Sequence, residues 1–143
     1  MIAIDPEDNR TIMLNRGDAT DELHPLAFHY PIWNYDTKQE EDYLFQLDDK
    51  ISFVVSNKKG YTQEEIFRVE KTIREMGIEE PTYYPEIQLT EEDTKMFPLS
   101  NKAQTFWYDL ILNDTTTMLG FMIDEDEKVG PSKIIVYPER EEI

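Results

Sequence analysis

In the segment Phe106-Trp107-Tyr108-Asp109-Leu110-Ile111-Leu112-Asn113-Asp114, the large apolar side chains recur at every second position. Because successive side chains point to opposite faces of an extended strand, this spacing predicts a β-strand with one buried face. Asn113 and Asp114 are turn residues, and they predict the end of the strand. The residues that share the predicted buried face are Phe106, Tyr108, Leu110 and Leu112.

Similar alternation predicts strands on both sides of this segment. A second strong pattern runs over residues 51–55, and further strands are expected at 11–14, 26–33, 87–89, 116–123 and 134–137. Residues 67–73 fit a strand slightly better than a helix, and both interpretations stay open. Thr62 and Thr90 each begin a capping-box pattern, which predicts a short helical turn. Residues 34–42 are charged and lack apolar periodicity, which predicts an exposed loop.

Six to eight short strands, separated by turn signals and joined by one or two helical turns, predict an all-β chain folded as a β-sandwich. With 143 residues, 39% of them hydrophobic, we expect a single domain over residues 1–143. Residues 1–10 are expected to form a short strand or an N-terminal arm, and residues 139–143 a charged tail. The absence of cysteine excludes disulfides and thiolate zinc sites, so stability must come from packing and backbone pairing.

The net charge of the chain limits the classes of partner that it can bind. Thirty-one acidic residues against fourteen Lys and Arg give a formal charge of −17, which argues against nucleic acid and anionic membrane surfaces. The apolar runs are too short to span a bilayer, and the N-terminus has no signal-peptide pattern, so we expect a soluble protein made in the cytoplasm. A partner with a basic face would associate faster, at a rate that falls with added salt.

The residue types that carry catalysis or bind metals show no recognisable pattern. His24 and His29 would lie on opposite faces of a regular strand, so a surface or hydrogen-bonded role is expected for each. Residues 124–135 fail the EF-hand pattern, which leaves only a looser calcium site among residues 124–127. Acidic residues are too abundant to mark a catalytic pair, which also needs a carboxyl in an apolar cleft. We expect no enzymatic activity, catalytic residue, metal or cofactor.

Four aromatic residues form the candidate interaction surface: Trp33, Tyr35, Tyr83 and Tyr84. Aromatic side chains are favoured as interface anchors. Trp33 and Tyr35 suit the core or the surface equally, Trp107 suits the core, and the Tyr83-Tyr84 pair between two prolines is the best exposed candidate. Arg16-Gly17-Asp18 matches an integrin-binding tripeptide, but in a turn its expected role is backbone geometry.

The order of several segments resembles that of a known family. These segments are Arg16-Gly17-Asp18 after the first strand, residues 48–55, residues 67–73 with Glu70-Lys71-Thr72-Ile73, residues 87–94, Trp107-Tyr108-Asp109-Leu110 and residues 133–136. From about Thr11 to Pro138 the chain resembles the N-terminal immunoglobulin-like domain of tail baseplate upper proteins from phages of Gram-positive bacteria. It departs from the family at Gln104-Thr105, which replace a glycine, and it ends at Ile143 without the long C-terminal part of such proteins.

The resemblance implies an immunoglobulin-like β-sandwich in a phage or prophage tail. Such a subunit would dock on other baseplate proteins and help present the receptor-binding apparatus. We expect a free-standing adaptor in the virion, made in the bacterial cytoplasm and homo-oligomeric in the assembled particle, with neither nucleic acid nor membrane as a partner. Two alternatives stay open: an acidic DNA-mimic inhibitor of a nucleic-acid-binding enzyme, and a carbohydrate-binding module.

Overall fold

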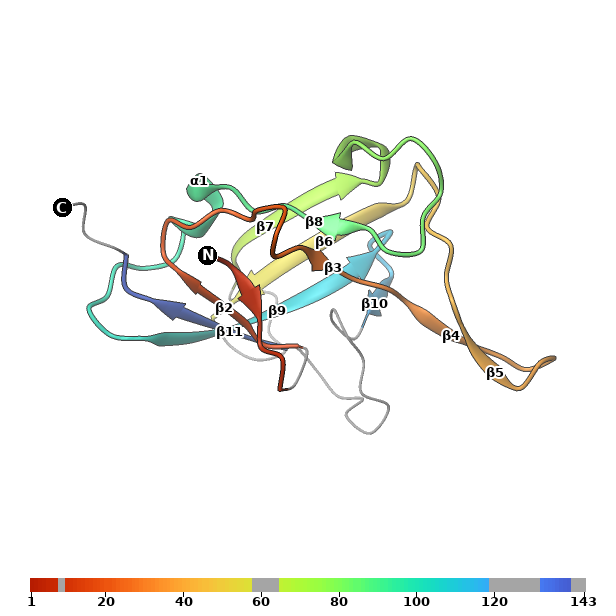
Figure 1. Ribbon diagram of the computed structural model, residues 1–143, viewed down its shortest axis with the longest axis horizontal. Helices are drawn as coiled ribbons and strands as arrows, with labels where there is room; N and C mark the ends of the chain where they lie inside the picture. The colour runs from red at the N-terminus through yellow and green to blue at the C-terminus, as the bar shows by residue number, and fades with distance from the viewer. Residues whose placement is uncertain (8–9, 58–64, 119–131, 140–143) are drawn as a thin grey trace.

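The computed structural model describes residues 1–7, 10–57, 65–118 and 132–139 (Figure 1). Strands dominate these residues, which confirms the all-β prediction. The helical elements among them are α1 (Glu91–Thr94) and the 3-10 turn η2 (Arg74–Met76). Thr90 and Asp93 form the predicted capping box at the start of α1. The second predicted capping box, at Thr62, and the looser calcium site at 124–127 lie outside the described residues.

The main sheet has seven strands, in the order β1-β2-β11-β9-β6-β7 with β10 also paired to β9. The neighbours β2 and β11 are parallel, and the other pairs are antiparallel. Its strands are β1 (Ala3–Ile4), β2 (Ile12–Asn15), β6 (Lys50–Ser56), β7 (Glu65–Thr72), β9 (Gln104–Leu112), β10 (Thr116–Met118) and β11 (Ser132–Tyr137). Strand β7 settles the strand-or-helix question at residues 67–73 in favour of the strand.

The core lies on one face of this sheet. The four residues of β9 predicted to share a face are all buried. The register continues that face into the neighbouring strands, because Phe53 on β6 lies opposite Leu110 and Ile134 on β11 lies opposite Phe106. Ile2 is also fully buried in this core, so the beginning of the chain belongs to the sheet and is not a separate arm.

A second layer covers the core face and makes the fold sandwich-like. It includes the short pair β3 (Leu26–Ala27) and β8 (Glu86–Ile87), whose apolar residues join the same core cluster as those of the main sheet. After α1, the Phe97 ring packs 5.2 Å from the ring of Phe67 and 5.0 Å from that of Phe106, between ring centroids. The predicted β-sandwich is therefore confirmed at the level of two packed layers.

Two sequence predictions need correction around residues 26–42. The single strand expected at 26–33 is two strands in different sheets, β3 and β4 (Pro31–Asn34). Of the exposed loop expected at 34–42, the exposure of residues 35–41 and a turn at 35–38 are confirmed, but Gln39–Asp42 form strand β5, which pairs with β4 as an antiparallel hairpin. Apolar alternation reports a strand with one buried face. Both faces of this hairpin are exposed, so β5 carries no such signal.

Turn chemistry at the end of β9 agrees with the prediction. Asn113 and Asp114 adopt left-handed backbone angles, with φ of 50° and 63°, a conformation that Asn and Asp tolerate better than most residues. The Asn113 side chain accepts a hydrogen bond from the Lys50 amide at 2.8 Å. The turn is thereby tied to the start of β6.

The importance of the β9 core face can be tested with Leu110→Ala. Because Leu110 is fully buried, we expect a loss of about 2–5 kcal/mol in the free energy of unfolding, measured by urea denaturation. Thr105→Ala, at an exposed position on the same strand, is the control and should cost less than about 1 kcal/mol. Equal losses for the two variants would contradict this assignment of the core.

Candidate docking surface

The hairpin β4–β5 projects from the body of the sandwich (Figure 1). It carries exposed apolar side chains: the exposed fraction is 41% for Ile32, 48% for Trp33 and 83% for Tyr35. A two-stranded ribbon without a packed face is only marginally stable by itself. Local hydrogen bonds and its connections to the body must therefore hold it.

Asn34 organises the tip of the hairpin. Its side-chain oxygen accepts hydrogen bonds from the amides of Asp36 at 2.9 Å and Thr37 at 3.3 Å. The Lys38 amide donates to the Asn34 carbonyl at 2.8 Å, and Lys38 adopts a left-handed φ of 57°. These bonds satisfy backbone groups that would otherwise depend on solvent, so the tip has a defined turn.

Asp42 connects the base of the hairpin to the body. One carboxylate oxygen lies 2.7 Å from Nδ1 of His29, and the other accepts a hydrogen bond from the Tyr84 hydroxyl at 2.9 Å. That hydrogen bond, together with the negative charge of Asp42, raises the pKa of Tyr84. Asp42, the last residue of β5, thus connects the hairpin to His29 and to Tyr84.

Backbone pairing places the Tyr83-Tyr84 segment beside that base. Phe45 and Thr82 form an isolated antiparallel bridge, with hydrogen bonds of 2.9 and 3.1 Å in the two directions. The Phe28 amide donates to the Pro85 carbonyl at 3.0 Å. The two tyrosines therefore lie between Thr82 and Pro85, both of which form backbone hydrogen bonds to other segments. Their rings, whose centroids are 6.4 Å apart, are exposed.

A second polar contact joins Tyr43, the residue that follows β5, to Asp49. The Tyr43 hydroxyl donates to Asp49 at 2.7 Å, which raises the pKa of Tyr43 to about 12. Asp49 also accepts hydrogen bonds from the Gln46 amide at 2.8 Å and the Asn113 side chain at 2.9 Å. Through Asn113, this carboxylate links the hairpin to the turn between β9 and β10.

A groove of about 490 Å³ runs along the hairpin. Its walls combine apolar or aromatic side chains with carboxylates, and none of the described residues that line it is Lys or Arg. The lining residues are Ile32, Trp33, Asn34, Tyr35, Asp36, Glu41, Asp42, Tyr43 and Leu44.

All four predicted surface aromatics are exposed: Trp33, Tyr35, Tyr83 and Tyr84. The first two lie on the hairpin, and Tyr84 reaches its base through Asp42. Sequence reasoning missed the parts of the site that depend on the hairpin, namely the exposure of Ile32, the role of Asp42 and the groove. Trp107, expected in the core, is half-buried on the opposite face of the main sheet.

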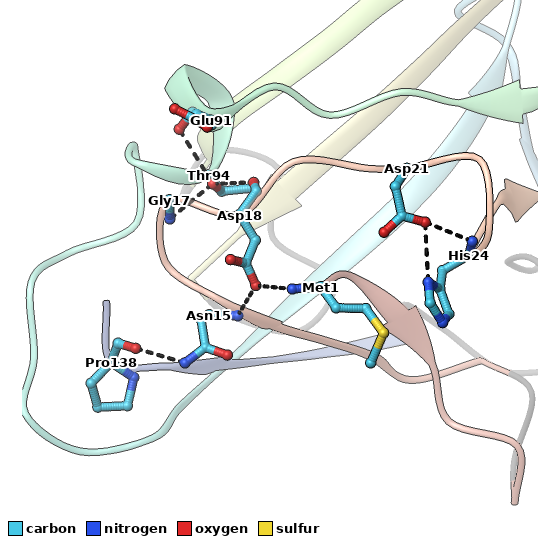
Figure 2. A network of polar contacts seen from close by, with 9 residues as sticks. All are labelled: Met1, Asn15, Gly17, Asp18, Asp21, His24, Glu91, Thr94 and Pro138. Carbon is cyan, nitrogen blue, oxygen red and sulfur yellow. Dashed lines mark hydrogen bonds and ion pairs between the residues drawn. The ribbon is translucent and has the colours of Figure 1, made fainter. Parts of the chain in front are cut away.

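Arg16-Gly17-Asp18 forms a structural turn. Asp18 accepts hydrogen bonds from the amino group of Met1 at 2.7 Å and from the Asn15 amide at 3.0 Å (Figure 2). The Arg16 guanidinium donates to the carbonyls of Phe97 and Lys95 and pairs with Glu139. Gly17 has a φ of +90°, and a Cβ there would lie 2.9 Å from Glu139 Oε1. The tripeptide is thus engaged within its own chain.

The Thr94 hydroxyl bonds that turn to α1. It accepts a hydrogen bond from the Gly17 amide at 3.0 Å and donates to the Asp18 carbonyl at 2.7 Å (Figure 2). Thr94 is fully buried, so these bonds are shielded from water. The end of β2 is therefore held against the segment that delivers Phe97 to the core.

The two histidines contact different carboxylates, since His24 bonds to Asp21 and His29 to Asp42. Across residues 1–7, 10–57, 65–118 and 132–139, no group of His, Asp or Glu side chains has an arrangement that would hold a metal ion. Burial raises the pKa of the Asp109 carboxyl, on the sheet face opposite the core. A raised pKa at one carboxyl does not by itself provide the acid and base that hydrolysis needs.

Comparison of the chain with protein-family models, curated proteins and solved structures finds no match at a significant level. Within the described part of the chain, no helix is long and apolar enough to cross a bilayer.

Acid should weaken the fold through Asp49. Burial raises the pKa of its carboxyl, but hydrogen bonds from Asn113, the Gln46 amide and Tyr43 outweigh burial and hold the pKa below the ordinary value of 3.8. Because the pKa is lower in the folded chain, the contribution of Asp49 to stability is present above pH 3.8 and is lost as the pH falls through the folded-state pKa.

We expect the free energy of unfolding of the natural chain to fall more steeply between about pH 5 and about pH 2 than that of Asp49→Asn. Urea denaturation at a series of pH values measures this difference. Asp48→Asn, at the neighbouring and highly exposed carboxyl, should keep the slope of the natural chain. Identical slopes for the natural chain and Asp49→Asn would contradict the role of this carboxylate.

Proposed function

We propose that this chain is a structural docking subunit of a phage or prophage tail baseplate. It binds other tail proteins through the hairpin β4–β5 and the adjacent Tyr83-Tyr84 segment, and it helps to present the receptor-binding apparatus. Its activity is binding and not catalysis. The observation that carries the proposal is a projecting ribbon with apolar side chains exposed on both faces and polar anchors at its base.

Exposure of these side chains favours an interface. A Trp and a Tyr on a protruding element gain large apolar contact area when a partner covers them, and such residues dominate binding energy at protein interfaces. The anchors at Asp42 and Asp49 hold the hairpin relative to the body before a partner arrives. Preorganisation of this kind lowers the entropic cost of association.

The tail setting comes from the resemblance of residues 11–138 to baseplate upper proteins. The sandwich-like all-β fold supports it, because the resemblance implies that fold. Tail baseplates are symmetric assemblies, in which weak contacts gain strength from the number of copies. We propose that the chain is homo-oligomeric there and acts as part of the virion.

The exposed aromatics also bear on the carbohydrate-binding alternative. A flat row of exposed rings would favour sugar binding, but the Tyr83 and Tyr84 rings are tilted by 53° relative to each other. For the DNA-mimic alternative, rows of free carboxylates are required. On β7, Arg68 instead pairs with both Glu65 and Glu70, which interrupts such a row. Both observations favour protein docking.

The proposal predicts that Trp33→Ala/Tyr35→Ala weakens binding to the tail proteins whose genes neighbour that of this chain. We expect at least a tenfold loss of affinity, about 1.4 kcal/mol or more, in mass photometry of the purified chain mixed with each tail protein. Because both side chains are exposed, the free energy of unfolding should stay nearly unchanged.

Leu23→Ala/Leu99→Ala is the matched control, since these leucines are 85% and 75% exposed and do not line the hairpin groove. This variant should bind as the natural chain does. Complex formation that survives in the hairpin variant, or the absence of a complex with every tail protein tested, would overturn the proposal.

A further inference from the structure

We propose that the groove along the hairpin binds an arginine side chain of a partner protein. This inference rests on the proposed docking function and specifies its chemistry. The guanidinium would lie at the carboxylates of Asp36 and Glu41, and the rest of the side chain would lie against the apolar wall. The groove residues that would take part are Ile32, Tyr35, Asp36, Glu41 and Leu44.

The electrostatics of the groove favour a cation. Among the lining residues that the structure describes, three are acidic and none is Lys or Arg. Glu41 accepts hydrogen bonds from the neutral side chains of Asn34 at 3.2 Å and Thr37 at 3.3 Å. Neither Asp36 nor Glu41 forms an ion pair with another described residue. Their charges are therefore not neutralised by a cation of the described chain.

The apolar wall favours arginine among cations. Ile32, on the same hairpin face as Glu41, and Leu44 offer aliphatic surface for the methylene stem, and Tyr35 offers an aromatic ring. A guanidinium is planar, more weakly hydrated than an ammonium, and able to stack on an aromatic face while it bonds to a carboxylate. A lysine would gain the charge attraction but not the stacking and the fork-shaped hydrogen bonding.

A second acidic groove in the same chain shows what distinguishes the hairpin groove. It has a volume of about 410 Å³ and includes Asp21, Glu22, Glu86 and Glu91 among its lining residues, but no aromatic residue of the described part of the chain. Asp21 there already accepts hydrogen bonds from the ring and amide of His24. Acidity alone is thus common on this surface, and its combination with exposed aromatics marks the hairpin.

The test is a titration of the isotope-labelled full chain with a capped peptide of alternating leucine and arginine, followed by NMR. A peptide with citrulline in place of arginine is the neutral control, because citrulline keeps the shape of the side chain and removes its charge. We expect shift changes at residues 31–44, and binding at least about tenfold weaker for the citrulline peptide. A lysine peptide should fall between the two.

Two single variants make the test specific to the groove. Glu41→Gln should weaken binding of the arginine peptide by about threefold to tenfold. Glu40→Gln is the matched control: Glu40 is exposed on the same strand, lies opposite Trp33 and does not line the groove. It should leave the affinity within about twofold of the natural value, because Glu40 lies on the hairpin face opposite Glu41 and cannot bond to a guanidinium held there.

Equal loss in Glu40→Gln and Glu41→Gln would overturn the inference, because general acidity would then explain binding. Equal binding of the arginine and citrulline peptides would also overturn it. Concentration-dependent shifts at the groove without peptide would identify a second copy of the chain as the occupant instead.

The inference and the docking function fail in different ways. Tail-protein binding that depends on Trp33 and Tyr35, with no response to the arginine peptide, would remove the guanidinium site and leave docking intact. A specific peptide response without any tail-protein complex would leave the groove intact and remove the proposed function.

Discussion

Burial of one face of β9 is the constraint on which the rest of the structure depends. Alternate β9 side chains fill the core, while the strand pairs with β6 along one edge and with β11 and β10 along the other. A register shift by one residue would send Phe106 and Leu110 to the opposite face and replace them with Trp107 and Asp109. The second layer, including Phe97, packs on this face and is positioned by the bonds of Thr94 and Arg16.

The hairpin follows a different physical rule from the sandwich. It has no packed face to stabilise it, so polar contacts take that role: Asn34 at the tip, and Asp42 and Asp49 at the base. These contacts leave Ile32, Trp33 and Tyr35 available to solvent. Because polar contacts fix the hairpin at its tip and base, it presents apolar residues in a defined geometry although it buries little surface itself.

Sequence reasoning worked where burial leaves a periodic pattern. It predicted the strands around Phe53, Phe106 and Ile134, the turn at Asn113 and the cap at Thr90, because each depends on local chemistry or on one buried face. It failed at Gln39–Asp42, where a solvated strand has no apolar alternation. It named the four aromatics of the docking surface but did not connect Tyr84 with Asp42, which is 42 residues away.

The sequence by itself determined the all-β class, the buried positions of β9 and the residue types available for binding. Alternation and turn propensities are local properties, and they can be recognised without knowledge of distant partners. Tertiary structure alone decided which strands are neighbours, that β4 and β5 project together, and that carboxylates and aromatic rings share one groove. Those outcomes depend on contacts between residues far apart in the chain. Such contacts form, and stabilise the chain, only when the layers pack together.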